Sequence, residues 1–237
     1  MTNPARHSVL IVDDDDDIRS NMRDILEDLG YETTIAEDGL AAIEALREKS
    51  YDVALLDYKM PGMDGATLSQ QIKQLSPKTV TIMITAFAGS DGAKQAREAG
   101  TWKVLRKPVD IAELAEDISS VLREPLVLVV DDDAEFCANL WEILRERSYR
   151  VATAKSEDQA MRLADTESWD VAIVDLRLES GDGRAVIHQL QRTEAKVIVV
   201  SGFADEFETV DSLWDCLRKP VDIERLLKAV SSATEPA

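Results

Sequence analysis

Short apolar runs alternate with longer amphipathic stretches through the first half of the chain. The amphipathic stretches carry apolar residues at the spacing of about 3.6 residues that is typical of helices, whereas the short runs are apolar on both faces. Such strands belong in a parallel sheet that helices cover on both sides. The pattern therefore predicts an α/β domain with a doubly wound, five-stranded parallel sheet. The predicted strands are Val9–Val12, Glu32–Ile35, Val53–Leu56, Thr79–Ile84 and Val104–Leu105, and the predicted helices are Asp16–Leu29, Gly39–Glu48, Gly65–Leu75, Gly92–Ala99 and Ile111–Leu122.

The second half of the chain repeats the first. A repeating unit of this length is a whole domain rather than one turn of a solenoid. We predict two tandem domains, residues 1–123 and 124–237, because Pro125 ends a helical pattern just before the next apolar run. The matching segments are Val9–Asp14 with Val127–Asp132, Tyr51–Asp57 with Trp169–Asp175, and the identical pair Leu105–Ile111 and Leu217–Ile223.

The composition limits the classes of partner. The 237 residues include 46 acidic and 27 basic ones, a formal net charge of −19. Nucleic-acid binding needs clustered Lys and Arg, and an anionic membrane repels an acidic chain, so neither partner is expected. Cys137 and Cys216 form neither a disulfide framework nor a metal-binding spacing, and the first residues lack the apolar stretch of a signal peptide. We therefore expect a cytoplasmic protein.

Carboxylates, a hydroxyl and a lysine follow the predicted strands in both halves. The carboxyl ends of parallel strands meet at one edge of a sheet, so Asp13, Asp14 and Asp57 should lie close together. Their charges repel unless a cation joins them, and hard carboxylate oxygens suit Mg²⁺. With Thr85 and Lys107 beside it, Asp57 is the expected nucleophile of a phosphoryl-transfer site. The second half offers Asp131, Asp132, Asp175, Ser201 and Lys219 in the same order.

These motifs resemble the receiver domains of two-component response regulators, present here as two copies. The resemblance covers nearly the whole chain and implies a flavodoxin-like fold with one Mg²⁺ in each domain. In the first domain it implies the phosphoacceptor Asp57, the metal ligands Asp13, Asp14, Asp57 and the backbone of Lys59, and the phosphoryl-binding or switch residues Thr85, Ala86 and Lys107. In the second it implies the phosphoacceptor Asp175, the metal ligands Asp131, Asp132, Asp175 and the backbone of Arg177, and the residues Ser201, Gly202 and Lys219.

Some positions depart from the family pattern. Val104 and Cys216 stand where the family usually has a switching Tyr or Phe. The interval between the hydroxyl and the lysine is about one helical turn shorter in the second domain, so we predict a shortened fourth helix at Asp205–Asp211. We expect Asp15–Asp17 to cap the first helix rather than to bind metal.

The resemblance implies a response regulator with two receiver domains and without a DNA-binding output domain. A histidine kinase or a histidine phosphotransfer protein is expected to phosphorylate Asp57, and Asp175 is the candidate for a second acceptor. Output is expected through contact with a downstream protein. Only slow self-catalysed phosphorylation and dephosphorylation are expected, so the protein is not classed as an enzyme.

Three alternatives stay open at the level of the sequence. The protein could be a phosphorelay intermediate or a phosphate sink, which the lifetime of the phosphoryl group would distinguish from a switch. It could be an aspartate-based, Mg²⁺-dependent phosphatase, although such enzymes usually have a second Asp where Lys59 and Arg177 stand here. It could also be a structural scaffold with vestigial sites.

Overall fold

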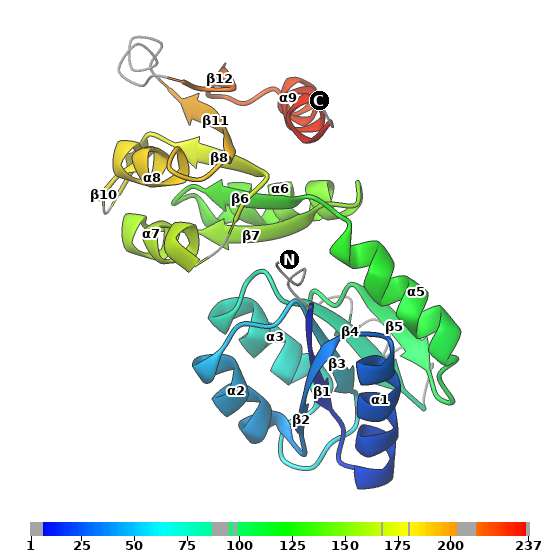
Figure 1. The fold of residues 1–237 in the computed structure, drawn as a ribbon. Coiled ribbons are helices and arrows are strands. Elements are labelled where there is room, and N and C mark those ends of the chain that lie inside the picture. Colours follow the sequence, from blue (N-terminus) through cyan, green and yellow to red (C-terminus); the bar gives the residue numbers. More distant parts are fainter. Residues whose placement is uncertain are drawn as a thin grey trace. The chain divides into compact units, whose positions relative to one another are not determined.

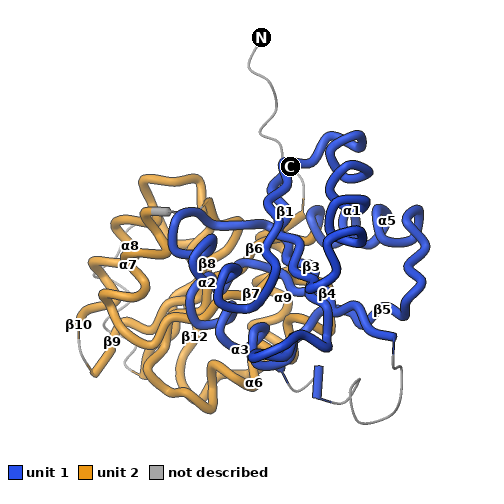
Figure 2. Tube along the Cα trace, turned by 90° about the horizontal axis from the view of Figure 1, so that it is seen from below, with its two compact units in different colours: residues 1–123 blue, residues 124–237 orange. Residues whose placement is uncertain are grey.

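The chain divides into two compact units, Met1–Arg123 and Glu124–Ala237, each with its own sheet (Figure 2). The structure is a computed structural model, and it describes residues 7–86, 95–96, 99–166, 168–179, 181–202 and 212–235. Among these residues, the helices are all too short or too polar to cross a membrane.

The first unit is a parallel five-stranded sheet with the strand order β2-β1-β3-β4-β5 (Figure 1). All five strands coincide with predicted ones to within a residue or two at each end. The strands are β1 (Ser8–Val12), β2 (Glu32–Ala36), β3 (Val53–Asp57), β4 (Val80–Thr85) and β5 (Lys103–Arg106), and the helices are α1 (Asp16–Asp28), α2 (Gly39–Glu48), α3 (Gly65–Leu75) and α5 (Ile111–Leu122).

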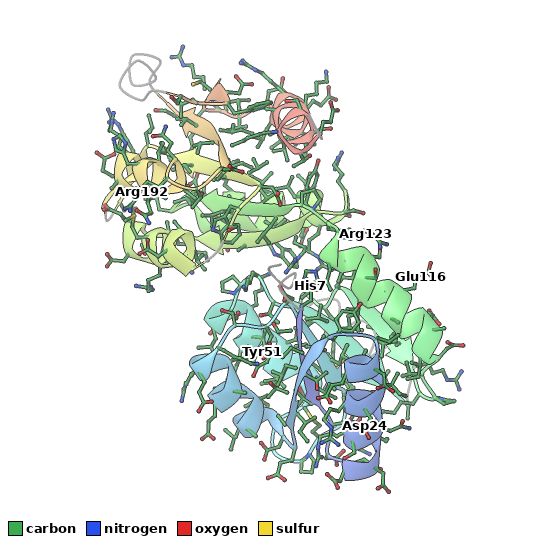
Figure 3. All side chains as sticks on the ribbon, viewed as in Figure 1. His7, Asp24, Tyr51, Glu116, Arg123 and Arg192 are labelled. Atoms are coloured by element: carbon green, nitrogen blue, oxygen red, sulfur yellow. The ribbon has the colours of Figure 1, made fainter. Side chains whose placement is uncertain are left out.

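Alternate residues of the central strands face opposite layers of helices. Leu10 and Leu56 pack with residues of α2 and α3, whereas Val9 and Leu55 pack with residues of α1 and α5. Tyr51, which precedes β3, is 1% exposed and joins the first of these two cores (Figure 3). This two-sided burial is the physical reason why the central strands are apolar throughout.

The second unit has the same architecture, with the strand order β7-β6-β8-β11-β12. A short antiparallel hairpin, which the sequence did not predict, follows the third strand of its sheet. The strands are β6 (Leu126–Val130), β7 (Arg150–Ala154), β8 (Val171–Asp175), β9 (Arg177–Leu178), β10 (Gly181–Asp182), β11 (Lys196–Ser201) and β12 (Asp215–Arg218), and the helices are α6 (Ala134–Arg145), α7 (Glu157–Thr166), α8 (Gly183–Leu190) and α9 (Ile223–Thr234).

Aspartates begin most of the helices. Asp15 caps α1, as expected, by accepting hydrogen bonds from the backbone N–H groups of Asp17 and Ile18. A side-chain oxygen at this position satisfies N–H groups that lack a partner within the helix. Part of the acidic charge thus stabilises helix ends. The other aspartate caps are Asp38, Asp64, Asp110, Asp133, Asp182 and Asp222.

The segments predicted as fourth helices lie largely outside the described residues. Of the helix predicted at Gly92–Ala99, the described residues are Gln95 and Ala96, which are helical, and Ala99, which lies in a turn. The shortened helix predicted at Asp205–Asp211 lies outside the described residues.

Candidate functional site

Four strands of the first unit bring acidic, hydroxyl and basic residues to one edge of the sheet. Asp13 follows β1, Asp57 ends β3, Thr85 ends β4 and Lys107 follows β5. The Lys107 Nζ atom lies 2.7 Å from Asp13 Oδ2 and 2.6 Å from Asp57 Oδ1. One ammonium group therefore joins two carboxylates that are themselves almost fully buried.

Backbone groups hold the remaining oxygens of these carboxylates. The N–H of Lys59 donates to Asp57 Oδ2 at 2.8 Å, and the N–H of Asp15 donates to Asp13 Oδ1 at 3.0 Å. Thr85 is buried, and its carbonyl accepts the N–H of Lys107 at 2.8 Å, while the next residue, Ala86, is exposed. The peptide bond between Lys107 and Pro108 is cis, as is that between Lys219 and Pro220.

The second unit repeats this arrangement. The Lys219 Nζ atom lies 2.8 Å from Asp131 Oδ2 and 2.5 Å from Asp175 Oδ2. The N–H of Arg177 donates to Asp175 Oδ1 at 3.0 Å. Ser201 is fully buried and its carbonyl accepts the N–H of Lys219 at 2.8 Å. Gly202 occupies the exposed position of Ala86.

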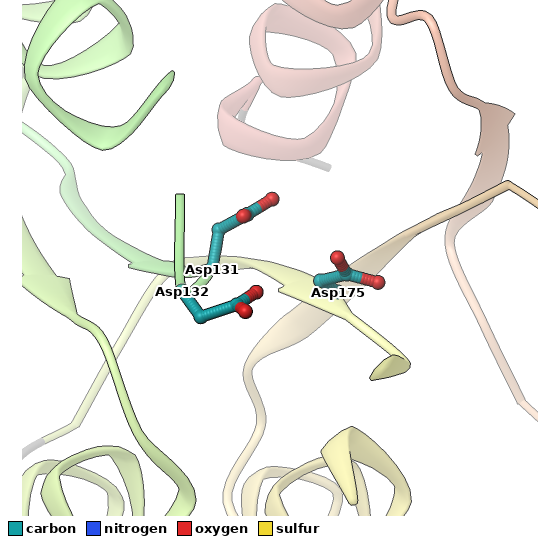
Figure 4. Close-up of side chains that lie close together, drawn as sticks. All are labelled: Asp131, Asp132 and Asp175. Carbon is teal, nitrogen blue, oxygen red and sulfur yellow. The ribbon is translucent and has the colours of Figure 1, made fainter. Parts of the chain in front are cut away.

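The two units differ in the second acid of the pair. In the second unit, one carboxylate oxygen from each of Asp131, Asp132 and Asp175 lies within 4.8 Å of the other two (Figure 4). Within the residues that the structure describes, Asp13, Asp57 and the exposed Asp14 do not form a group of this kind. The sequence therefore places Asp14 at the correct edge, but the structure brings only its counterpart Asp132 into the cluster.

The acidic cluster is chemically suited to Mg²⁺. Its donors are hard carboxylate oxygens, which Mg²⁺ prefers, and Mg²⁺ is usually bound by few protein ligands and keeps several waters. Three carboxylates within one small space also create a negative potential that a divalent cation relieves. The donor set of Asp131, Asp132 and Asp175 thus fits this ion.

Burial and charge oppose each other at both sites. Burial raises the pKa of Asp57 and of Asp131, and their lysine partners partly offset this increase. Burial disfavours the charge of Lys107 and Lys219, yet the hydrogen bonds to two carboxylates outweigh it and raise the pKa of each lysine. Both lysines therefore stay protonated at neutral pH.

The helix that follows each candidate phosphoacceptor begins at a glycine, and this glycine packs against the backbone of the phosphoacceptor. A Cβ atom on Gly65 would stand 2.4 Å from the carbonyl oxygen of Asp57, and one on Gly183 would stand 2.0 Å from that of Asp175. The N–H groups of the same glycines bond the carbonyls of Tyr58 and Leu176. Glycine thus allows the chain to return closely past the strand end.

Sequence reasoning missed a buried residue behind each first aspartate. The Arg19 Nη1 atom donates to the carbonyl of Asp13 at 2.6 Å, and in the corresponding place the thiol of Cys137 donates to the carbonyl of Asp131 at 3.2 Å. A signal existed, because Arg19 falls on the apolar stripe of α1 together with Met22 and Leu26. A charged residue on such a stripe indicates a buried partner.

Two parallel sheets, each with an acid–lysine site at its carboxyl edge, define a protein with two doubly wound α/β domains. The sequence model of the response regulator receiver domain matches residues 9–119 and 127–231, so the chain belongs to this family and carries the domain twice. The family and the α/β fold that the sequence predicted are thereby confirmed.

Relatives match either the whole chain or one of its domains. The chain is 36% identical over 222 residues to a response regulator receiver protein of Anaeromyxobacter sp. (strain Fw109-5). The matched segment covers 93% of this chain and 92% of that protein. The chain is also 43% identical over 108 residues to the DNA-binding transcriptional regulator NtrC of Escherichia coli (strain K12). This match covers 46% of this chain and 23% of NtrC. A CheY-like receiver domain protein from Methanospirillum hungatei JF-1 matches with a TM-score of 0.47 and 32% identity, covering 48% of this chain and 92% of that chain.

Proposed function

We propose that the protein is a response regulator that accepts phosphoryl groups on Asp57 and on Asp175. The observation that carries this proposal is the contact between each candidate acceptor and a lysine that also holds the first acid of the same unit. A buried carboxylate can act as the nucleophile, and the lysine ammonium beside it is already in place as the counter-ion of the acyl phosphate that forms.

The donor is a phosphohistidine on a histidine kinase or a histidine phosphotransfer protein. A carboxylate oxygen of Asp57 attacks phosphorus, the P–O bond of an acyl phosphate forms, and the P–N bond to the donor breaks. The imidazole leaves with a proton from solvent, so atoms and charge balance. Slow attack of water on the acyl phosphate returns the carboxylate and releases inorganic phosphate.

Mg²⁺ would be held by the carboxylates of each unit. The ligands would be Asp13, Asp14 and Asp57 with the backbone carbonyl of Lys59, and Asp131, Asp132 and Asp175 with that of Arg177. When bound, the ion supplies neutralisation of the charge on the transferring phosphoryl group. Lys107 and Lys219 orient the acceptor carboxylates and hold a phosphoryl oxygen.

Output follows from the hydroxyl at the end of the fourth strand of each sheet. Thr85 and Ser201 are the groups proposed to hydrogen-bond the phosphoryl oxygens, with Ala86 and Gly202 leaving space beside them. This bond shifts an existing equilibrium between two conformations of the domain, and a downstream protein binds one of them.

Intact-mass measurement after incubation with Mg²⁺ and acetyl phosphate tests this function. The wild type is expected to gain two phosphoryl groups, Asp57→Asn and Asp175→Asn one each, and the double variant none. Absence of label on Asp57 would overturn the proposal, and label on Asp57 alone would restrict it to the first unit. Labelling in the presence of EDTA would contradict the role of Mg²⁺.

A further inference from the structure

The second acid of the pair is held in place in one unit and not in the other. The backbone N–H of Glu179 donates to Asp132 Oδ2 at 3.2 Å and keeps this carboxylate beside Asp131 and Asp175. Pro61 stands at the corresponding position of the first unit, four residues after the acceptor. Proline has no backbone N–H, so this donor cannot exist for Asp14, which is exposed.

The charge behind the first acid also differs. In the first unit the buried guanidinium of Arg19 bonds the carbonyl of Asp13, whereas the neutral thiol of Cys137 does so in the second. Asp16 pairs with Arg19, but its side chain is 80% exposed while that of Arg19 is 9% exposed. Water screens the exposed carboxylate more than the buried guanidinium, so Arg19 places a positive charge behind Asp13 where the second unit has a neutral thiol.

We infer that the second unit binds a divalent cation more tightly than the first and fills first as the cation concentration rises. The inference rests on the proposed function in so far as the acid clusters are the cation sites. Glu179 acts as a positioning residue through its backbone, and Arg19 as a residue that weakens the first site. The ammonium groups of Lys107 and Lys219 bridge the carboxylates in the same way and do not distinguish the units.

Preorganisation sets the size of the difference. In the first unit Asp14 must lose side-chain freedom when the ion binds, whereas the Glu179 N–H already fixes Asp132. Immobilising one side chain of this kind changes an affinity by roughly three- to tenfold. Removal of the Arg19 charge is expected to recover about threefold at the first site.

Titration of the full chain with Mn²⁺, followed by the electron paramagnetic resonance signal of the free ion, measures both sites without any phosphodonor. The wild type should show two classes of site that differ in affinity by about fivefold. Asp132→Asn should weaken the tighter class, and Asp14→Asn the weaker class. The inference would be overturned if the two sites bound Mn²⁺ with equal affinity, or if Asp14→Asn weakened the tighter site.

Two substitutions at Glu179 separate its backbone from its side chain. Glu179→Pro removes the N–H and should weaken the tighter class about fivefold, whereas Glu179→Ala keeps the N–H and should stay within about twofold. Arg19→Gln retains a donor for the Asp13 carbonyl without its charge and should tighten the weaker class. This variant lies in the other unit, so it tests the inference even if Glu179→Pro does not fold.

The Mn²⁺ titration and the labelling experiment together distinguish failure of the proposed function from failure of this inference. If Mn²⁺ binds with the expected asymmetry but acetyl phosphate labels neither aspartate, the proposed function fails and the inference stands. If both aspartates are labelled but the two classes are equal, the inference alone is wrong. If Mn²⁺ binds to neither unit, both fail.

Discussion

Lys103, the first residue of β5, ties this edge strand to α5. Its Nζ atom lies 2.7 and 2.8 Å from the two oxygens of Asp117 and 3.1 Å from Glu113. The Asp117 side chain is 13% exposed and would lose its cation in Lys103→Met. We expect this substitution to lower the free energy of unfolding by about 1 kcal/mol at neutral pH, as measured by urea denaturation.

The same contact makes the effect of Lys103→Met depend on pH. The hydrogen bond that Lys103 donates to Asp117 is the largest cause that raises the pKa of Lys103 above its ordinary value of 10.5. The folded state therefore holds the proton more tightly, so the stabilisation is present below 10.5 and is lost as the pH rises through the higher folded value. Wild type and variant should converge in strong alkali. Lys49→Met is the control, because the exposed pair of Lys49 with Glu32 should contribute only about 0.5 kcal/mol; equal losses in the two variants would contradict this account.

At the scale of the element, the first residue of α3, Gly65, packs closely against the end of β3. Gly65→Ala would place Cβ 2.4 Å from the Asp57 carbonyl oxygen and 2.7 Å from Met83 Sδ. The backbone oxygen cannot move without shifting the acceptor strand, so we expect a loss of about 1–3 kcal/mol in thermal or urea unfolding.

Gly202→Ala is the matched control for Gly65→Ala. A Cβ atom on Gly202 would meet no heavy atom within 4 Å in the described structure, and alanine already stands at the corresponding position, Ala86. Its unfolding free energy should change by less than about 0.5 kcal/mol. A tolerated Gly65→Ala would show that the strand end adapts more easily than its packing indicates.

A buried hydroxyl cluster links α3, β4 and the segment before β5 in the first unit. Ser69 Oγ lies 2.8 Å from Thr81 Oγ1 and 3.5 Å from Thr101 Oγ1, and all three residues are buried. The second unit has Ile187, Val197 and Leu213 at these positions and packs them in an apolar core. The same packing site is thus filled by polar groups in one unit and by apolar ones in the other.

Paired substitutions in this cluster should be strongly non-additive. Ser69→Ala or Thr81→Val alone leaves a buried hydroxyl with fewer partners and should cost about 1–2 kcal/mol. The double variant should cost less than the sum of the two, because both polar groups are gone. A double-mutant cycle from urea unfolding measures the coupling, with Thr33→Val, whose hydroxyl bonds Glu27 at the surface, as the control. Additive losses would argue against the hydrogen bond.

The sequence predicted elements better than it predicted contacts. The strand that ends at the proposed acceptor, predicted as Val53–Leu56, could be predicted because its apolar residues are buried on both faces. The different positions of Asp14 and Asp132 were missed, because a side-chain direction depends on a donor from a distant loop, the N–H of Glu179. The small hairpin that carries Glu179 leaves too short a pattern to be recognised.

At the scale of the molecule, each unit has its own core and its own site. The hydrophobic clusters of the first unit contain residues between Val9 and Leu122, and those of the second contain residues between Leu126 and Ala233. If both acid–lysine sites accept phosphoryl groups, as proposed, the protein is either a switch with two inputs or a phosphate sink for a relay. The lifetime of the phosphoryl group in each unit separates these roles, since a sink must lose its label quickly.

Lys59 and Arg177 offer a means to test what sets that lifetime. Each stands two residues after an acceptor and is exposed, while its backbone N–H bonds the acceptor carboxylate. We expect a long side chain anchored there to shield the proposed acyl phosphate from water, so Lys59→Ala in the Asp175→Asn background should speed loss of label from Asp57 about threefold. Arg177→Ala in the Asp57→Asn background should do the same for Asp175. Intact mass followed over time gives both rates. Lys49→Ala should leave the rate unchanged, because Lys49 pairs with Glu32 at the amino end of β2, at the edge of the sheet opposite Asp57. If the Lys59→Ala and Lys49→Ala variants both lose the phosphoryl group at the wild-type rate, shielding by the Lys59 side chain does not set its lifetime. The lifetime, which separates a switch from a sink, then depends on the buried groups of each site.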